Sequence, residues 1–375
     1  MPGLFVARHA EAAALFNTVG VVYVHPDNNI QTPEITDNLE NGLRVIRVYY
    51  PVVKCKTPLL SLFRKGKAFQ KNSSQAINYY IGKYGKPQLI HANILTRAGY
   101  IAMKHAERLR IPYIITEHWS RYLPVRNEYN GWIRKMITKK VVRQAAALLP
   151  VTENLSAAMK SYHLENQVTE VIANVVDDMF FQSYRPAFQD DRLFRIVHVS
   201  CFDEKAKNVK GIFRAMKELQ LSGKNFFLEL IGEGPDFEEV KQYAANCGLS
   251  DQHYAFRGML TGDSLTRAIA GSHCLLLFSN FENMPVVIAE AFACGIPVIS
   301  SRVGGIHEVV NQENGILVPA GDEIALKDAV IRMMENIGEY NKEKIHAFAK
   351  ENFSMQTIGS KLTEIYHQAI TRFKK

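Results

Sequence analysis

Short apolar runs alternate with longer segments of helical period along the chain. Residues 21–24, 145–151 and 275–278 are mainly apolar at consecutive positions, which is typical of strands buried on both faces of a parallel sheet. The segments between such runs carry apolar residues at helical spacing and are bounded by Gly and Pro. The alternation predicts an α/β protein, and no tandem repeat at solenoid periods interrupts it.

The most informative stretch is 275–308, which reads LLLFSNFENMPVVIAEAFACGIPVISSRVGGIHE. Pro285 suits the first position of a helix, and Gly295 suits its end. The stretch therefore predicts a strand over 275–278, a loop over 279–284 and a helix over 286–294. A second strand over 296–300, a glycine loop at 304–305 and a helix bearing Glu308 are expected to follow.

Two acids give this stretch its chemistry. Glu282 lies in the loop, and Glu290 lies about a turn and a half inside the helix. A helix N-terminus suits a phosphate, whereas acids beside it are suited to accept hydrogen bonds from hydroxyls. A ribose and a sugar on either side of a diphosphate supply such hydroxyls. The alternative, an ordinary βαβ unit with two solvated acids, leaves Glu290 unexplained among its apolar neighbours.

The pattern Glu-x7-Glu, followed by A-x-A-C-G-I-P-V-I and V-G-G-x-x-E, closely resembles the retaining GT-B glycosyltransferases of family 4. The resemblance implies that Glu290 holds the ribose of a nucleotide. It implies that Glu282, as a catalytic residue, lies beside the transferred sugar. Asn283 and Met284, just before the helix, are then expected to contact the donor as well.

The resemblance also implies an α/β fold of the GT-B type, in which two Rossmann-like domains face each other across a cleft. We expect an acceptor-binding domain over 1–180, a nucleotide-sugar-binding domain over 181–354, and a C-terminal helix over 355–375 that crosses back to the first domain. A polar linker covers 182–192. Family members usually have a strand before the segment that Gly3 opens, so the first strand of the N-terminal domain is expected to be missing.

Other segments match the donor side of the family. Lys207 falls where a catalytic Lys neutralises the diphosphate, although Cys201 stands where an Arg usually does. Lys205 and Lys210 are the alternatives to Lys207. For Gly3, a plain loop glycine is the alternative to a donor contact. The resemblance implies donor contacts at five further positions, with the base read around the last three of them: Gly3, Gly234, Arg257, Gly258 and Met259.

Two histidines lie near the ends of predicted strands. His91 belongs to 87–93 and His118 ends 111–118, and ligands gather at the carboxyl ends of strands in open α/β sheets. The Thr116-Glu117-His118 sequence resembles the family's T-x-H position, whose His touches the acceptor or the sugar. His118 is therefore expected in catalysis and acceptor binding, together with His91 and Arg121 in the acceptor site. A structural role is the alternative for both histidines.

The charge of the chain favours anionic partners. It has 375 residues, a formal net charge of +8 and a pI near 9.1. Nucleotide sugars, lipid phosphates or an anionic membrane fit this charge, and no nucleic acid is expected because no nucleic-acid-binding module is evident. Residues 54–71 and 132–143 are basic and carry no acid, so both are expected to contact an anionic membrane. For 54–71, a solvated helix that packs its leucines inward is the alternative.

Cysteine usage and hydropathy bear on location. Five scattered cysteines without a C-x-x-C pair predict buried free thiols in a reducing compartment and no metal site. Neither a membrane span nor a signal peptide is evident. We expect a cytoplasmic protein associated with the inner face of the cell membrane. No cofactor is expected besides the nucleotide-sugar substrate, because Lys207 and helix termini can take the place of a metal cation.

The resemblance thus implies a retaining, metal-independent hexosyltransferase. It would move a sugar from a nucleotide diphosphate sugar to a hydroxyl acceptor, lipid-linked or free, in cell-surface polysaccharide or glycolipid synthesis. Two alternatives stay open: a non-catalytic GT-B subunit that binds nucleotide sugar or a partner enzyme, and a GT-B nucleotide-sugar epimerase. A glycoside hydrolase is disfavoured, because its two acids flank the scissile bond from separate elements.

Overall fold

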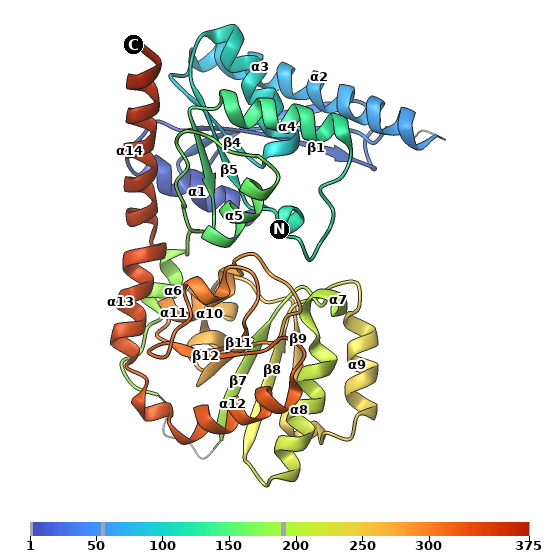
Figure 1. Ribbon diagram of the computed structural model, residues 1–375, viewed down its shortest axis with the longest axis vertical. Coiled ribbons are helices and arrows are strands. Elements are labelled where there is room, and N and C mark those ends of the chain that lie inside the picture. The colour runs from blue at the N-terminus through green and yellow to red at the C-terminus, as the bar shows by residue number, and fades with distance from the viewer. Residues whose placement is uncertain (1–2, 54–56, 189–192, 375) are drawn as a thin grey trace. The chain divides into compact units, whose positions relative to one another are not determined.

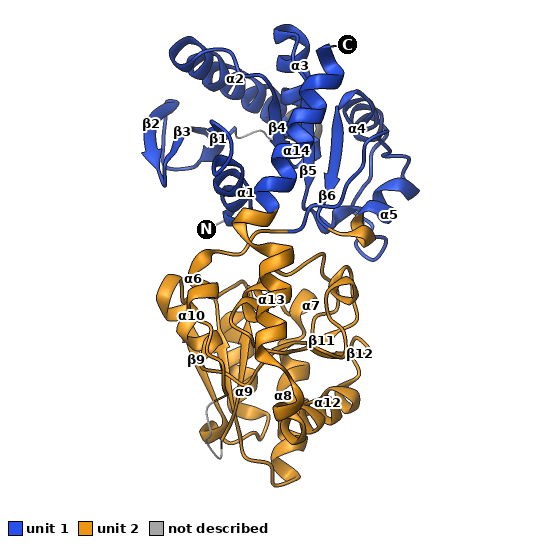
Figure 2. Cartoon of the chain, turned by 90° about the vertical axis from the view of Figure 1, so that its left-hand side faces the viewer, with its two compact units in different colours: residues 1–151, 156–173, 358–375 blue, residues 152–155, 174–357 orange. Residues whose placement is uncertain are grey.

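The computed structural model describes residues 3–53, 57–188 and 193–374, which divide into two compact units (Figures 1 and 2). Unit 1, blue in Figure 2, comprises 1–151, 156–173 and 358–375. Unit 2, in orange, comprises 152–155 and 174–357. Both units combine parallel strands with helices, so the predicted α/β class is confirmed.

Unit 1 contains two three-stranded sheets, of strand order β1-β3-β2 and β4-β5-β6. From the sequence we expected an N-terminal sheet without its first strand. In the described residues, the strands of unit 1 form two separate sheets rather than one. The strands are β1 Gly20–Asp27, β2 Glu34–Glu40, β3 Leu43–Pro51, β4 Ile90–Asn93, β5 Tyr113–Glu117 and β6 Ala147–Pro150. The helices are α1 Leu4–Ala14, α2 Pro58–Tyr84, α3 Tyr100–Leu109 and α4 Trp132–Gln144, the short turns η1 Leu95–Gly99 and η2 Ser120–Tyr122, and most of α5 Glu153–Ser161 and α14 Met355–Lys374.

Strand β2 is the element of unit 1 that the apolar pattern missed. It is antiparallel to β3 and pairs Glu40 with Leu43 across a two-residue turn, Asn41-Gly42. Both turn residues have positive φ, 47° and 79°, as the favoured hairpin turns require. Most of β2 is exposed, so it lacks the apolar run that reveals a buried strand. The Asn-Gly pair was the available signal.

Unit 2 is built on one six-stranded parallel sheet of order β12-β11-β10-β7-β8-β9. Helices α8 and α12 pack side by side on one face of it (Figure 1). Their apolar side chains belong to the same buried core as those of the central strands. The strands are β7 Phe194–Val199, β8 Phe226–Ile231, β9 Tyr254–Gly258, β10 Cys274–Leu277, β11 Val298–Ser301 and β12 Gly315–Val318. The helices are α6 Asp178–Gln182, α7 Glu204–Lys207, α8 Val209–Leu221, α9 Phe237–Asn246, α10 Gly262–Ala270, α11 Val286–Ala293, α12 Glu323–Glu335 and α13 Lys342–Phe353, with short turns η3 Asp251–His253, η4 Ile306–Glu308 and η5 Ile337–Glu339.

Two predictions about unit 2 are wrong. The helix expected to bear Glu308 is only the three-residue turn η4, because Val309 leaves helical geometry at once. Cys201 was expected to be buried, but it is exposed, because it follows the end of β7 in a loop. Of the other cysteines, Cys274 and Cys294 are buried free thiols, and Cys55 lies outside the described residues.

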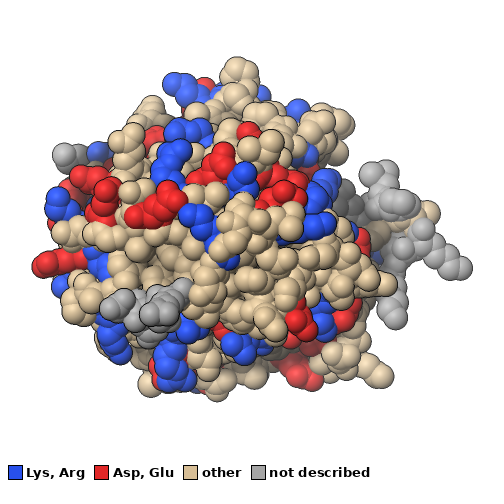
Figure 3. Space-filling view, turned by 90° about the horizontal axis from the view of Figure 1, so that it is seen from below, with Lys and Arg blue, Asp and Glu red and all other residues tan. Residues whose placement is uncertain are grey.

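Two surface properties bear on partners. Within the described ranges, no helix combines the length and the apolar character that crossing a bilayer requires. On the face drawn in Figure 3, acidic and basic side chains lie next to one another. The net positive charge is therefore not gathered on that face.

Candidate functional site

Strand order in unit 2 reverses between β7 and β10, which pair in parallel near the middle of the sheet. In open parallel sheets, ligands bind beyond the carboxyl ends of the strands at such a point. The loop after β7 leads into α7, which ends at Lys207, and the loop after β10 contains Glu282. Two predicted site residues, 75 positions apart in the chain, therefore come to the same edge of the sheet.

The side chains of Lys207 and Glu282 form an ion pair through Nζ and Oε1. They are only 14% and 11% exposed, so the pair is sheltered without being sealed from solvent. Ser279 Oγ donates a second hydrogen bond to Glu282 Oε1, at 2.8 Å. Both Lys207 and Ser279 thus hold the carboxylate of Glu282. The charged pair lies at the edge of the sheet where the strand order reverses.

Backbone contacts also join the two loops. Asn280 donates its main-chain N–H to the carbonyl of Ala206, at 2.8 Å, and its side-chain amide to the carbonyl of Lys205, at 3.0 Å. These carbonyls belong to the C-terminal end of α7, where helical carbonyls have no partner within the helix. The position of Lys207 relative to Glu282 is therefore fixed by the backbone as well as by their charges.

His198 lies beneath this pair and was not recognised from the sequence. It is fully buried in β7, its Nδ1 is 2.8 Å from the carbonyl oxygen of Leu276, and its Nε2 is 2.8 Å from Ser200 Oγ. A carbonyl only accepts, so Nδ1 carries the proton and Nε2 accepts from the hydroxyl. The pKa of His198 is lowered to about 4, mainly by burial and in smaller part by the charge of Lys207, while the hydrogen bond to the Leu276 carbonyl opposes the change. The signal available was one polar residue inside an otherwise apolar strand.

The glycine loop after β11 packs directly on the loop of Glu282. A Cβ atom at Gly304, whose φ is 56°, would lie 2.1 Å from the carbonyl oxygen of Glu282. A Cβ atom at Gly305 would lie 2.4 Å from Thr152 Cγ2, and its N–H donates to the carbonyl of Asn283 at 2.8 Å. The paired glycines therefore allow a backbone approach that no other residue permits.

At the start of α11, no side chain at the N-cap accepts a hydrogen bond from the free backbone N–H groups. Its N-cap is Pro285, which makes no side-chain cap hydrogen bond. By contrast, the start of α8 is filled, because Glu204 accepts hydrogen bonds from Val209 N at 2.8 Å and Lys210 N at 3.1 Å. The backbone N–H groups at the start of α11 are thus more available to an anion than those at the start of α8.

Asn283 and Met284 are buried, at 8% and 7% exposure. Asn283 Oδ1 accepts from Thr152 Oγ1 at 3.0 Å, and the carbonyl of Met284 accepts from Asn174 at 3.3 Å. Both residues thus shape the loop before α11. Whether they also contact a donor stays a prediction.

The two other acids of the motif differ. Glu290, in α11, is partly exposed, and its charge adds to burial, the larger cause, in raising the pKa of Cys294 to about 12. Glu308 accepts hydrogen bonds from the N–H groups of Glu153 and Asn154, at 2.8 and 2.6 Å. Glu308 therefore caps the beginning of α5, which is a structural role.

The sheet edge expected to read a base is formed by β9. Arg257 Nε donates to Glu229 Oε1 at 2.6 Å, while Met259 is 56% exposed. Gly258 has a φ of 65°, and its carbonyl accepts from Gly232 N at 2.8 Å. The nearby turn needs Gly234, because a Cβ atom there would lie 1.9 Å from the carbonyl oxygen of Cys201. These positions have the geometry of a backbone turn, and base contact stays a prediction.

In unit 1, His118 is the centre of an aromatic cluster. Its Nε2 lies 3.0 Å from Asn93 Oδ1, and its ring centroid lies 4.6 Å from that of Phe5 and 5.2 Å from that of His9. Gly3 begins the same helix as Phe5, with a φ of 90° and open space where a Cβ would be. The conformation, rather than a close contact, explains glycine at that position.

The other acceptor-side residues of unit 1 have internal partners. His91 uses both ring nitrogens, at 2.7 Å from Tyr366 Oη and at 2.7 Å from Thr116 Oγ1, and burial lowers its pKa to about 3. Arg121 stacks its guanidinium on Trp119, 3.6 Å from the ring centroid, and burial lowers the pKa of Arg121. His91 thus connects α14 to β5. Whether His91 or Arg121 contacts an acceptor stays a prediction.

Among the residues that the structure describes, no group of three or more His, Cys, Asp or Glu side chains could hold a metal ion. The polar features of the site are thus an ammonium, carboxylates and backbone N–H groups. This donor set suits a ligand that combines negative charge with hydroxyls.

Comparison with known families agrees with this geometry. Residues 185–352 match the family model described as Glycosyl transferases group 1, and residues 11–180 match Glycosyltransferase Family 4. Among curated relatives, the N-acetyl-alpha-D-glucosaminyl L-malate synthase of Bacillus anthracis is 31% identical over 182 residues, which are 47% of this chain and 45% of that protein. The chain thus spans less than half the length of that relative.

Two longer matches are more distant. The MMP alpha-(1->4)-mannosyltransferase of Mycolicibacterium hassiacum is 23% identical over 80% of this chain and 75% of its own. The putative teichuronic acid biosynthesis glycosyltransferase TuaC of Bacillus subtilis is 25% identical over 78% and 72%.

Solved structures are similar over nearly the whole chain. Sucrose-phosphate synthase from Thermosynechococcus elongatus has a TM-score of 0.75 and 20% identity over 99% of this chain and 94% of its own. Anabaena Alr3699/HepE in complex with UDP and glucose has a TM-score of 0.71 and 17% identity over 97% and 96%. At such identities the likeness concerns the fold alone, and it confirms the predicted GT-B class.

Proposed function

The chain belongs to the glycosyl transferases of group 1, family 4, and from this premise we propose that it is a retaining, metal-independent glycosyltransferase. It moves a sugar from a nucleotide diphosphate sugar to a hydroxyl acceptor in cell-surface polysaccharide or glycolipid synthesis. The observation that carries the proposal is the Lys207–Glu282 pair at the switch point of the sheet. It joins a cation for phosphate to an acceptor for sugar hydroxyls.

The donor binds with its diphosphate at Lys207 and the uncapped start of α11. Lys207 then exchanges its contact with Glu282 for the phosphate, and Glu282 accepts hydrogen bonds from the sugar. Glu290, within the same helix, accepts hydrogen bonds from the ribose. Because Asn280 fixes the two loops, this charge distribution exists before the reaction, which is the condition for electrostatic stabilisation of a departing phosphate.

The reaction breaks the bond between the anomeric carbon and the phosphate oxygen. Positive charge then grows on the sugar and negative charge on the phosphate. The ammonium and the helix N–H groups stabilise the phosphate as it leaves, which is the task that a metal performs elsewhere. The departing phosphate takes the proton of the attacking hydroxyl, and the new bond forms on the same face of the sugar. The role in catalysis and acceptor binding that the sequence predicts for His118 is part of the same proposal, and within unit 1 the Nε2 of this residue lies 3.0 Å from Asn93 Oδ1.

A lipid-linked acceptor is brought to the enzyme by the basic surface of unit 1. On α4, Trp132 is 73% exposed and Met136 57%, and basic residues lie between and beside them. On α2, Phe63 is 59% exposed, with Lys67 Nζ 4.6 Å from its ring centroid. Exposed aromatic and basic side chains together suit an anionic bilayer surface. Residues 54–56 lie outside the described part of the chain, as do the side chains of 58–60 and 62.

A screen of UDP-, GDP- and ADP-sugars tests the proposal. A donor at about a hundred times its dissociation constant should add roughly 2.7 kcal/mol to the free energy of unfolding. With an acceptor, NMR should then detect a glycoside of unchanged anomeric configuration, formed equally well with a metal chelator present. An inverted product contradicts the retaining mechanism. Binding without turnover indicates a non-catalytic subunit, and conversion of the donor alone indicates an epimerase.

A further inference from the structure

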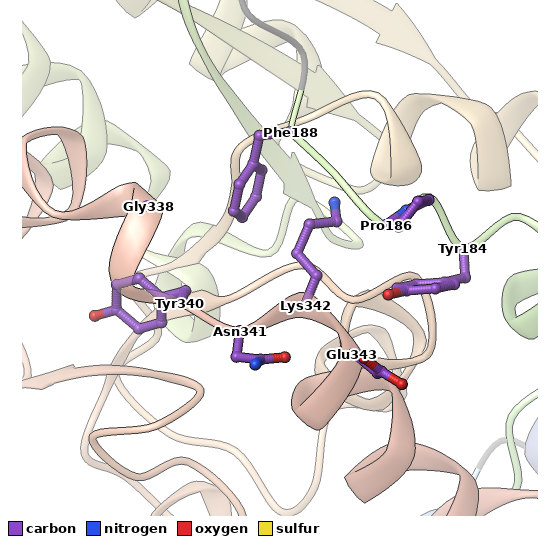
Figure 4. Close-up of a pocket in the computed structure, with 8 residues that line it drawn as sticks. All are labelled: Tyr184, Pro186, Phe188, Gly338, Tyr340, Asn341, Lys342 and Glu343. Carbon is purple, nitrogen blue, oxygen red and sulfur yellow. The ribbon is translucent and has the colours of Figure 1, made fainter.

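A second polar feature lies in unit 2, in a pocket with a cavity volume of about 350 Å³ (Figure 4). The pocket is formed between the segment that contains Tyr184 and Phe188 and the chain that leads through Tyr340 into α13. Its volume falls in the lower part of the range for small-ligand sites. Three aromatic side chains in its lining favour a ligand with a flat apolar body.

Lys342, the first residue of α13, supplies the charge of this pocket. Its exposure is 4%, and in Figure 4 its side chain extends into the space between Phe188 and Pro186. Nζ lies 4.3 Å from the ring centroid of Phe188, a cation–π contact. Neither a hydrogen bond nor an ion pair joins this ammonium to any of the residues that the structure describes, and Glu343 points away from it in Figure 4.

An ammonium on a largely buried side chain is energetically unfavourable where, among the described residues, no anion lies beside it. Accordingly, burial lowers the pKa of Lys342 to about 8, and the thiol of Cys294 opposes the change only in part. The positive end of α13, a helix of 12 residues, adds to the same positive potential. Asn341 Oδ1 caps that end only at Lys344 N, at 2.9 Å. A carboxylate ligand would offset the positive charge that the described lining of the pocket presents.

We propose that this pocket binds a small aromatic carboxylate. The carboxylate pairs with the Lys342 ammonium at the start of α13, and the ring packs among Tyr184, Phe188 and Tyr340. Among the described residues that line the pocket, Lys342 is the one cation, so a monoanion suits it, and the exposed Glu343 at its edge disfavours a ligand of higher charge. This site is separate from Lys207 and Glu282, and the proposal does not depend on the glycosyltransferase reaction.

Calorimetric titration of the full chain with 4-hydroxybenzoate tests this proposal. Two further probes separate the contributions: 4-hydroxybenzyl alcohol keeps the ring without the charge, and acetate keeps the charge without the ring. We expect saturable binding of 4-hydroxybenzoate to one site, with each partial probe at least about tenfold weaker. Absence of saturable binding up to about 10 mM overturns the proposal, as does acetate binding that equals that of 4-hydroxybenzoate.

Variants locate the binding. Lys342→Met should weaken 4-hydroxybenzoate binding at least about tenfold, because it removes the charge and keeps the length of the side chain. Lys344→Met, an exposed position on the same helix, should change the affinity less than about twofold. Phe188→Leu should weaken 4-hydroxybenzoate binding severalfold. If Lys342→Met does not fold, the affinity of Phe188→Leu relative to the wild type decides instead. Wild-type affinity in Lys342→Met, or in Phe188→Leu where that variant decides, overturns the proposal.

Discussion

Asn280 and Ala206 share a backbone hydrogen bond of 2.8 Å that joins the loop after β10 to the helix after β7. The contact crosses the point where the strand order of the sheet reverses. Because it involves main-chain atoms, it fixes the loops independently of the charges that they carry. The ammonium of Lys207 and the carboxylate of Glu282 can therefore change partners without moving their backbones.

Lys207→Ala should lower kcat/KM for sugar transfer by about 100- to 1000-fold, because it removes the cation nearest to the departing phosphate. Steady-state kinetics with the donor found by screening provides the measurement. Lys210→Ala is the matched control, since Lys210 is paired with Glu239 at 2.5 Å and should leave the rate nearly unchanged. A large loss in the control alone would move the phosphate contact to Lys210, which was an alternative from the sequence.

Gly304→Ala should destabilise the protein by about 1–3 kcal/mol, because alanine is strained at a φ of 56° and its Cβ would lie 2.1 Å from the carbonyl oxygen of Glu282. Urea unfolding measures the loss. Gly338→Ala serves as control, because nothing lies within 4 Å of its Cβ position and its φ is not positive. Equal stability of the two variants would contradict the close packing described for Gly304.

Sequence and structure agree best where a local pattern determines the structure. The buried strands of unit 2 are apolar runs, so their existence could be predicted, and Pro285 and Gly295 mark the ends of α11 within a residue or two. The exposed strand β2 has no such run, although Asn41-Gly42 announces its turn.

The sequence predicted the charged residues of the candidate site, but not the contacts that hold them in place. Lys207 and Glu282 could be proposed from a family motif, whereas their contact depends on the order of strands in the sheet, which no local pattern encodes. The same holds for His198, whose two partners come from β10 and from the loop after β7. Asn283, which was expected to contact the donor, is buried in the loop and accepts a hydrogen bond from Thr152, which no local pattern predicted; its contact with a donor stays a prediction.

Acid should destabilise the protein between about pH 6.5 and pH 4 through His198. Its pKa is about 4 in the folded state and 6.5 as an unperturbed group, so the unfolded state binds more protons within that window. The contribution is on the order of 3 kcal/mol, present above pH 6.5 and lost as the pH falls towards 4. His198→Gln, which retains an amide donor for Leu276, should flatten this dependence in urea titrations. An unchanged pH profile would contradict the assignment.

Lys342→Met should raise the free energy of unfolding at pH 7. The pKa of Lys342 is lowered from 10.5 to about 8, so folding disfavours its charged form. The unfolded state binds more protons between pH 8 and pH 10.5, and wild-type stability should therefore rise relative to the variant across that interval. Denaturation at pH 7 and pH 10 measures the difference, with Lys344→Met as the exposed control. A variant advantage that grew with pH would contradict the burial of an uncompensated charge.

Trp132→Ala should weaken binding to vesicles of anionic phosphatidylglycerol severalfold, because it removes a 73% exposed aromatic ring among the basic residues of α4. Co-sedimentation with vesicles measures the bound fraction, and phosphatidylcholine vesicles should bind little of either protein. Ile324→Ala is the matched control, since Ile324 is 72% exposed but lies on α12 of unit 2. If Ile324→Ala weakens binding as much as Trp132→Ala does, exposed apolar area in general, rather than the surface of α4, attracts the vesicles. Binding that does not change with Trp132→Ala would place the membrane contact elsewhere or show that none exists.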